Sequence, residues 1–458
     1  MRVSILPRFF LLALLFCCAL TSSASWWWPF GGKKSALDDY QPPEVQHGKY
    51  IPTDGDLSKK IYQKKDPDDD ISVKKVQDLA KRGNSNAQLT LGKIYFDGRA
   101  GEKQDFRKAF HWFSEAAKNG NAEAMYNVAI CYDGGFGVRK ANPKMALSWY
   151  QNAADHGVPE AQLKTAVFAE TQGKPEMAFK YYKLLADNGE PACQLQVALQ
   201  YLNGYGVATD SVAAVEYLLK SAEQGNTRAQ IRLADCYQQG VGTPRDFREV
   251  FHWLTLAAHD GDPEGQAKLG VCYLQGIGTE ENGDLAFHWF KISAEAKYSV
   301  GQYLLGNCYR DGIGTEQNDH SALEQYILSA DAGEALAQYE LAVAFYEGRG
   351  TRQDLKLAKE WLEKAAKGDL PIAKVRLAMM LSQDSAAGKA DPARAKKLFD
   401  EAEKTQDDTA MLQIALCYLN GKVVAADREK ARKMLEAAAV SGDHHAAEIY
   451  KIYFGKEF

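Results

Sequence analysis

The feature that most constrains the fold of this chain is a repeat with a period of 36 residues. Four similar segments begin at Ala229, Gly265, Gly301 and Ala337. Each carries an aromatic residue eight positions after its start: Tyr237, Tyr273, Tyr309 and Phe345. A fixed period of this length is typical of a helical solenoid, because one such unit cannot bury its apolar face alone. We count ten copies between about residues 71 and 443, of which the third, residues 161–189, is shortened.

Each copy reads as two helices joined by a tight turn. In "AQIRLADCYQQGVG", the residues Ile231, Ala234 and Tyr237 recur at helical spacing. Gly240 then ends the first helix, because glycine tolerates the left-handed conformation that often follows a helix. Gly242 completes the turn. The pattern therefore predicts a helix, a Gly-x-Gly turn and a second helix in every copy.

The second helix of each copy has its own signature. Nine copies carry a strong N-cap residue four positions before the first core alanine: Asp105, Asn142, Asp210, Asp246, Asn282, Asn318, Asp354, Asp391 and Asp427. The shortened copy has Lys174 there instead. Further along, a tryptophan or tyrosine precedes a pair of small residues, as Trp112 precedes Ala116 and Ala117. We expect the small pair to let the paired helix approach and the large ring to be buried beside it.

The full pattern, A-x3-L-[AG]-x2-Y-x2-G-x-G-x5-D-x3-A-x2-W-x4-A-x2-G, resembles the Sel-one-like repeat, a relative of the tetratricopeptide repeats. The resemblance covers most of the chain. It implies an all-α fold, an α/α superhelical solenoid of about ten helix-turn-helix repeats, that serves as an adaptor or scaffold. The family includes exported bacterial proteins and a quality-control component of the endoplasmic reticulum, and it transmits no common active site.

The N-terminus indicates export. Arg2 and Arg8 precede "FFLLALLFCCAL", an apolar run of 12 residues, and the small residues "TSSAS" follow. This order is that of a secretory signal peptide, over residues 1–25 with cleavage after Ala24 or Ser25. The run is too short to span a bilayer, which needs about 20 apolar residues. Lipid attachment at Cys17 or Cys18 is the alternative, although the preceding residues are larger than such signals favour.

The rest of the chain divides around the repeats. Residues 26–70 are rich in proline, glycine and charge and predict a flexible linker. Trp26, Trp27 and Trp28 open it, either as an apolar start that packs on the first helices or as an anchor at a membrane surface. Residues 71–443 form the repeat array, and residues 444–458 are expected to add a C-terminal capping helix. No second apolar run of spanning length follows the signal, so no stable membrane span is expected after its cleavage.

The conspicuous side chains recur with the repeat, which argues against a unique catalytic residue. Five cysteines directly precede the repeat tyrosine, where other copies have Ile94, Ala344 or Met380, so this position predicts a small apolar niche. His111, His252 and His288 each precede the repeat tryptophan. The sequence contains no zinc-protease, phosphate-loop or nucleophile-elbow motif. We therefore expect no catalytic residue, no cofactor and no metal, His444 and His445 included.

A non-catalytic scaffold that binds a protein or peptide partner is the leading hypothesis. Repeat arrays of this kind offer an extended concave groove lined by the first helices. Arg232, Lys268 and Glu340, variable polar residues on those helices, are the candidate groove residues. The net charge of -5 and the lack of a basic face exclude nucleic acid as an expected partner.

Two other functions stay open at this point. One is a hydrolase acting on cell-wall or β-lactam-type substrates, for which the irregular third copy supplies only Glu170 and Glu176. The other is a glycan or peptidoglycan binder without chemistry. The signal peptide predicts a periplasmic or secreted protein of a bacterial cell envelope. The terminal sequence "FGKEF" lacks a retention tetrapeptide of the endoplasmic reticulum.

Overall fold

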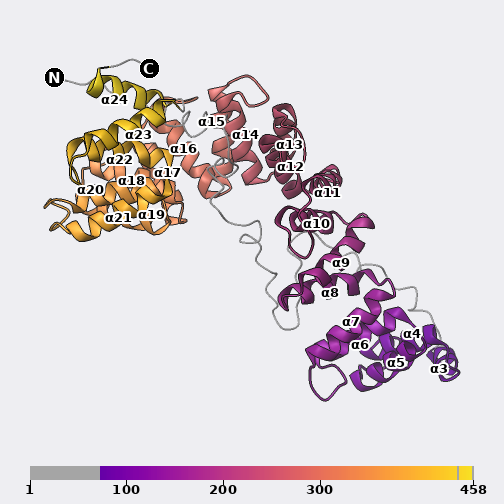
Figure 1. Cartoon of the computed structure of the whole chain (residues 1–458). Coiled ribbons are helices and arrows are strands. Elements are labelled where there is room, and N and C mark those ends of the chain that lie inside the picture. The colour runs from indigo at the N-terminus through magenta and orange to yellow at the C-terminus, as the bar shows by residue number, and fades with distance from the viewer. Residues whose placement is uncertain (1–72, 441–442, 456–458) are drawn as a thin grey trace. The chain divides into compact units, whose positions relative to one another are not determined.

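The computed structural model describes residues 73–440 and 443–455, so the predicted signal peptide and linker lie outside the described residues. Within these ranges every regular element is an α-helix, and there are no strands apart from one isolated bridge between Ser385 and Gly388. The helices follow one another as hairpins (Figure 1). The chain divides between Arg245 and Asp246 into two compact units, which we call the N-terminal and the C-terminal unit.

The N-terminal unit begins with α3 (Val73–Lys81) and continues as alternating first and second helices of the repeat. The first helices are α4 (Ser85–Asp97), α6 (Ala122–Gly134), α8 (Pro159–Thr171), α10 (Pro191–Asn203) and α12 (Thr227–Gln239). The second helices are α5 (Phe106–Lys118), α7 (Pro143–Asp155), α9 (Pro175–Asp187) and α11 (Ser211–Glu223). From α4 to α10 each first helix packs on the second helix before it and on the one after it, and α12 packs on α11.

The C-terminal unit continues the same alternation. Its first helices are α14 (Pro263–Gln275), α16 (Ser299–Asp311), α18 (Ala335–Glu347), α20 (Pro371–Leu381), α22 (Asp408–Asn420) and α24 (His444–Phe454). Its second helices are α13 (Phe247–His259), α15 (Gly283–Glu295), α17 (Asp319–Asp331), α19 (Leu355–Lys367), α21 (Pro392–Thr405) and α23 (Arg428–Val440). The segment predicted as a C-terminal cap contains α24, which packs on α23.

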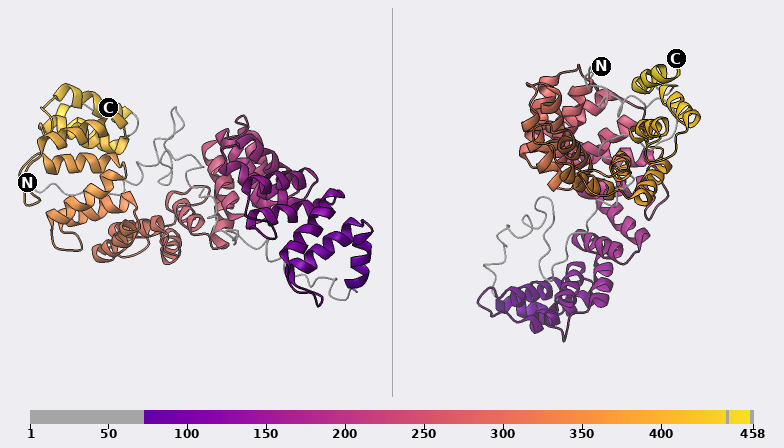
Figure 2. Two further views of the ribbon diagram at one scale, coloured as in Figure 1. Left: turned by 90° about the horizontal axis from the view of Figure 1, so that it is seen from below. Right: turned by 90° about the vertical axis from the view of Figure 1, so that its left-hand side faces the viewer.

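The first helices form the inner layer of the C-terminal unit. There α14 contacts α16 directly and α20 contacts α22, whereas no second helix of this unit's described residues makes a comparable contact with the next second helix. Figure 2 shows the helices of this unit following an arc. A layer whose helices touch is shorter than a layer whose helices do not, so the first helices lie on the inside of the arc.

The predicted N-caps are confirmed. In all nine copies the side chain of the cap residue accepts a hydrogen bond from a backbone N–H two or three residues later, as Asp246 does from Arg248 at 2.9 Å. Lys174 makes no such bond at the start of α9. Most first helices also end as predicted, with Gly240 in the left-handed conformation at the end of α12, whereas α8 ends at Gln172 and α20 at Ser382.

The expected burial of the aromatic residue before the small pair is confirmed at Trp253, Tyr181 and Tyr217, but in other copies the large side chain that is buried is the next residue. Trp112 and Trp289 remain partly exposed, whereas the next residues, Phe113 and Phe290, are each 1% exposed. This ring lies over a small residue of the first helix. A Cβ added to Gly270 would come within 2.6 Å of Phe290 Cε1. Glycine therefore occupies the position on the first helix against which the Phe290 ring packs.

The cysteine niche is confirmed as a packing position, with one exception. All six cysteines of the described residues are free and buried. Burial raises the pKa of the thiols of Cys131, Cys236, Cys272 and Cys308 to about 12. In the fourth copy, however, Gln200 occupies this niche at 1% exposure, and neither its amide oxygen nor its amide nitrogen has a hydrogen-bond partner. The niche is therefore not uniformly apolar.

A row of buried glutamines, which the sequence analysis missed, joins six of the ten repeats to the second helix that precedes each of them. The amide nitrogen of each donates to the carbonyl oxygen of an alanine near the end of the preceding second helix, at 3.0–3.4 Å. The residues are Gln88, Gln162, Gln194, Gln230, Gln266 and Gln338. These bonds satisfy carbonyls that a helix end leaves without an intrahelical partner. The signal was present as a small residue followed by glutamine in most copies.

The second glycine of the turn has a different task from the first. It lies against the second helix of the preceding repeat, where a Cβ on Gly278 would overlap the carbonyl oxygen of Phe247. Five equivalent glycines make the same approach: Gly137, Gly206, Gly242, Gly314 and Gly350. In the last copy this position is Val423, which adopts a left-handed φ of 67°. The turn is therefore a contact between neighbouring repeats as well as a link within one.

The end of α19 differs from the ends of other second helices, where a left-handed glycine such as Gly333 follows the cap residue. In α19 the cap residue itself is Gly368. Its φ is -75°, and the left-handed residue is the next one, Asp369, with φ 60°. A Cβ at Gly333 would meet no atom within 4 Å. A side chain at this position therefore has room, so only the backbone conformation opposes a residue other than glycine.

Candidate interaction face

Two rows of side chains run along the first helices from repeat to repeat. The first row, which we call the Arg232 row, contains the three predicted groove residues and their equivalents: Lys164, Gln196 and Arg232 in the N-terminal unit, and Lys268, Leu304, Glu340 and Arg376 in the C-terminal unit. The second, the Arg310 row, stands six residues later on each helix and includes Asp133, Glu170, Arg310 and Tyr346. Unlike the caps, glycines and glutamines, these residues change in charge from copy to copy.

The two rows meet between neighbouring repeats. Arg310 Nη1 on α16 lies 3.0 Å from Glu340 Oε2 on α18. The same pair of positions joins Glu170 on α8 to Gln196 on α10, where Gln196 Nε2 donates to Glu170 Oε1 at 3.1 Å. A residue of the Arg310 row therefore contacts the Arg232-row residue of the next repeat. The chemistry of each contact depends on which two side chains the sequence places there.

The strongest concentration of charge on this face surrounds Arg310. Its Nε and Nη2 donate to the two carboxylate oxygens of Asp311 at 2.8 and 2.7 Å, so one guanidinium serves two carboxylates. Burial opposes the charged guanidinium, but Glu340 and Asp311 hold the pKa of Arg310 above its ordinary value. With both carboxylates ionised the three groups carry one net negative charge. Such a buried arrangement fixes α16 against α18.

A tyrosine hydroxyl reaches the same region from the second helix. Tyr326 on α17 occupies the deeply buried ring position, and its hydroxyl donates to Asn307 Oδ1 on α16 at 2.7 Å. Burial raises the pKa of Tyr326 well above its ordinary value, so the phenol stays protonated. In the third copy the equivalent Tyr182 hydroxyl donates to Glu170 Oε2 at 3.0 Å. These tyrosines link the ring position to the polar residues of the first helices.

The three predicted groove residues lie in the same row but are not brought together. Arg232 is on α12 in the N-terminal unit, 37% exposed at its side chain, with its Nη1 3.5 Å from Asp235 Oδ2. Lys268 on α14 is almost fully buried at its side chain, and its Nζ lies 3.0 Å from Glu264 Oε1. Glu340 on α18 is engaged by Arg310. Periodicity identified the row, but not the degree to which each member is covered.

The two residues considered for the hydrolase alternative have different surroundings. Glu170 accepts hydrogen bonds from Tyr182 and Gln196, and Glu176 is exposed in the first turn of α9. Within residues 73–440 and 443–455, no three histidine, cysteine, aspartate or glutamate side chains come together to hold a metal. His111 and His252 are exposed and lie edge-on to the neighbouring tryptophan at 5.1 Å.

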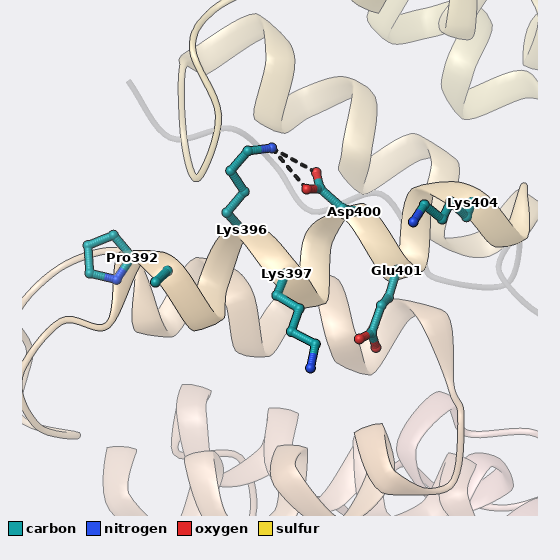
Figure 3. A pocket seen from close by; sticks show the side chains of 7 residues that line it. Pro392, Lys396, Lys397, Asp400, Glu401 and Lys404 are labelled. Atoms are coloured by element: carbon teal, nitrogen blue, oxygen red, sulfur yellow. Dashed lines mark hydrogen bonds and ion pairs between the residues drawn. The ribbon is translucent and has the colours of Figure 1, made fainter.

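The concave region on α21 is an open helix surface. Its seven lining residues all come from this one helix, among them Lys396, Lys397 and Lys404 (Figure 3). Lys396 Nζ pairs with Asp400 Oδ2 at 2.9 Å on the same helix. No helix of the described residues is both long and apolar enough to cross a membrane.

Comparison with known families identifies the repeat. The Sel1 repeat model matches ten segments, which together cover more than half of the chain: residues 85–121, 122–158, 159–190, 191–226, 227–262, 263–298, 299–334, 335–370, 371–404 and 409–443. No curated protein sequence matches the chain.

Solved structures agree with this assignment. A protective antigen of uropathogenic Escherichia coli with an SLR fold is 29% identical, with a TM-score of 0.62 over 84% of each chain. A Sel1 repeat protein from Oxalobacter formigenes is 28% identical, with a TM-score of 0.53 over 66% of this chain and 88% of its own. The fold is therefore an all-α, α/α solenoid of ten helix-turn-helix repeats, and the chain belongs to the Sel1 repeat family.

Proposed function

We propose that this chain is a non-catalytic scaffold of the bacterial cell envelope that binds a protein segment on the first-helix side of its C-terminal unit. Sel1 repeats generally mediate protein interactions, and the ten matched segments support that part of the proposal. The location on the first helices is supported by the difference between recurring and variable side chains. Residues that recur in every copy serve contacts between helices, whereas Lys268, Glu340 and Arg376 differ in charge at one equivalent position.

In-cell photocrosslinking tests this location. A photoreactive amino acid replaces Tyr346, which is 45% exposed on the first helix α18, or Leu328, which is 51% exposed on the second helix α17. We expect one defined protein to be captured from Tyr346 and not from Leu328, because only Tyr346 lies on the proposed binding side. Equal capture from both positions, or none from Tyr346 in a folded protein, would contradict the proposal.

Export is the second part of the proposal, and it is supported by the sequence order of residues 1–25 alone. The expected result is a mature chain that begins at Ser25 or Trp26 and is recovered from the periplasm or the medium. Cell fractionation followed by N-terminal sequencing measures both. A chain that keeps Met1 and stays in the cytoplasm would refute export while leaving the binding surface to be tested separately.

A further inference from the structure

The two rows on the first helices form an ion pair between one pair of repeats, and the next pair of repeats has no carboxylate at the equivalent position. Arg310 and Glu340 pair across α16 and α18. One repeat further, the equivalent positions hold Tyr346 on α18 and Arg376 on α20. A tyrosine ring cannot neutralise a guanidinium as a carboxylate does. Arg376 is thus a cation at a position where its counterpart Glu340 has an oppositely charged partner.

Arg376 makes no ion pair in the described part of the chain. Its side chain is partly buried, and its Nε is fully covered without a hydrogen-bond acceptor. Guanidinium groups carry five N–H donors and no acceptor. Leaving one of these donors buried and unpaired opposes folding, because the group loses its hydrogen bonds to water. The other charged members of this row in the unit, Lys268 and Glu340, both have partners.

A second cation without an ion pair lies in the next repeat. Lys422, in the turn after α22, is exposed and forms no ion pair within the described residues. Its backbone N–H donates to the carbonyl oxygen of Cys417 at 3.0 Å, which fixes the turn against α22.

We propose that Arg376, with Tyr346 in the preceding repeat and Lys422 in the following one, binds the carboxylate of an aspartate or glutamate side chain of the partner segment. This inference rests on the proposed function and names the chemistry that the partner presents. A carboxylate supplies acceptors for two terminal guanidinium N–H groups at once, the geometry for which arginine is suited. Tyr346 adds an exposed hydroxyl donor.

Fluorescence anisotropy with a defined probe tests the site on the full mature chain. The probe is a labelled peptide that carries four glutamates among glycines and serines, and the matched peptide carries four glutamines. We expect the glutamate peptide to bind in preference to the glutamine peptide. Arg376→Gln should weaken its binding at least about tenfold, because a charge-assisted hydrogen bond is lost. Arg394→Gln is the control, because that guanidinium already pairs with Glu363 at 2.9 Å on the second helices.

A stability measurement separates a binding role from a structural one. Arg376→Met removes the unpaired donor and fills the side chain's space as far as the position of Nε, so it should raise or preserve Tm while it abolishes binding. A lower Tm would show that Arg376 is structural and overturn the inference. Equal binding of the two peptides, or unchanged binding by Arg376→Gln, would also overturn it. Displacement of the glutamate peptide by inorganic phosphate would reassign the site to phosphate groups.

The carboxylate site at Arg376 and the scaffold function can each be refuted separately. If the partner captured from Tyr346 in cells is captured equally by Arg376→Gln, the carboxylate site is wrong and the binding surface stands. If nothing is captured from Tyr346 although the purified chain binds the glutamate peptide, the site stands and the proposed scaffold function is contradicted.

Discussion

At the scale of single residues, Gly270 and Phe290 make a close steric contact between the two helices of one repeat. We predict that Gly270→Ala lowers the free energy of unfolding by about 1–3 kcal/mol, because the new methyl group would come within 2.6 Å of the ring. The companion change Phe290→Leu should restore part of the loss, since Ala342 and Leu362 already form such a pair in the eighth repeat. Urea unfolding of both single variants and the double variant measures the coupling. Strictly additive effects would contradict the steric explanation.

Gln200 offers the opposite case, a residue that the fold tolerates at a cost. We predict that Gln200→Cys raises the free energy of unfolding by about 1–3 kcal/mol, because it removes two buried polar atoms that have no partner. Gln194→Met, on the same helix, is the matched control. Its amide is also buried but donates to the carbonyl of Ala186 at 3.2 Å, so its loss should destabilise. The same sign for both changes would refute this account.

Residue-scale predictions from the sequence succeeded where the partner is close along the chain. The caps were predictable because Asp246 and the backbone N–H that it accepts from are two residues apart. The glutamine row was missed because Gln266 bonds to Ala258, on the far side of a helix end. The burial of Lys268 was unpredictable for a further reason. It depends on how neighbouring repeats cover one helix, and the repeat spacing carries no such information.

At the scale of elements, the Gly-x-Gly turn decides how closely one repeat follows the next. We predict that Gly278→Ala destabilises the chain strongly, because the added methyl group would overlap the carbonyl oxygen at the start of α13 and the backbone there is left-handed. Val423→Gly should do the reverse. A β-branched residue at φ 67° is strained, and glycine adopts this conformation freely. Thermal unfolding of the two variants measures both effects. A lower Tm for Val423→Gly would mean that the packing of this side chain outweighs its strain.

The helices themselves were predictable because the residues that begin and end each helix lie close to its ends in the sequence. Caps, glycines and apolar spacing located the first and second helices of the copies. What the sequence could not supply was the identity of the buried ring, since Trp289 and Phe290 are adjacent and equally apolar. Helix rotation decides between them, and it is fixed by the close approach of Phe290 to Gly270 on the partner helix.

At the scale of the whole molecule, the buried thiols predict the response to alkaline pH. The pKa of Cys131, Cys272 and Cys308 is raised by burial to about 12 in the folded chain, against 9.0 for a free thiol. Their contribution to stability is therefore complete below pH 9 and is lost as the pH rises from 9 toward 12. We expect the free energy of unfolding to fall above pH 9. It should fall less steeply in a variant with alanine at these three positions. A slope that does not change would exclude the thiols as its cause.

Accessibility of the same thiols gives an independent measurement. With thiolates suppressed and side chains buried, a thiol-specific reagent should react slowly with the native protein and fully after denaturation. The prediction concerns the six cysteines of the described residues, so the protein to use is the mature chain that begins after the predicted signal peptide. Fast reaction of even one thiol in the native state would contradict the prediction and show that this cysteine becomes accessible to the reagent.

The bond from each buried glutamine to the helix before it has a consequence for how such a protein can change its length. A repeat such as the sixth carries both halves of this joint, because Gln266 is the donor to the preceding copy and its second helix ends in the same way as those that supply the acceptor. A tandem duplication of one 36-residue segment in the gene would therefore bring a ready-made junction with it. Growth by copying needs no compensating mutation, and a lineage can alter the span of its array faster than it can evolve a new surface.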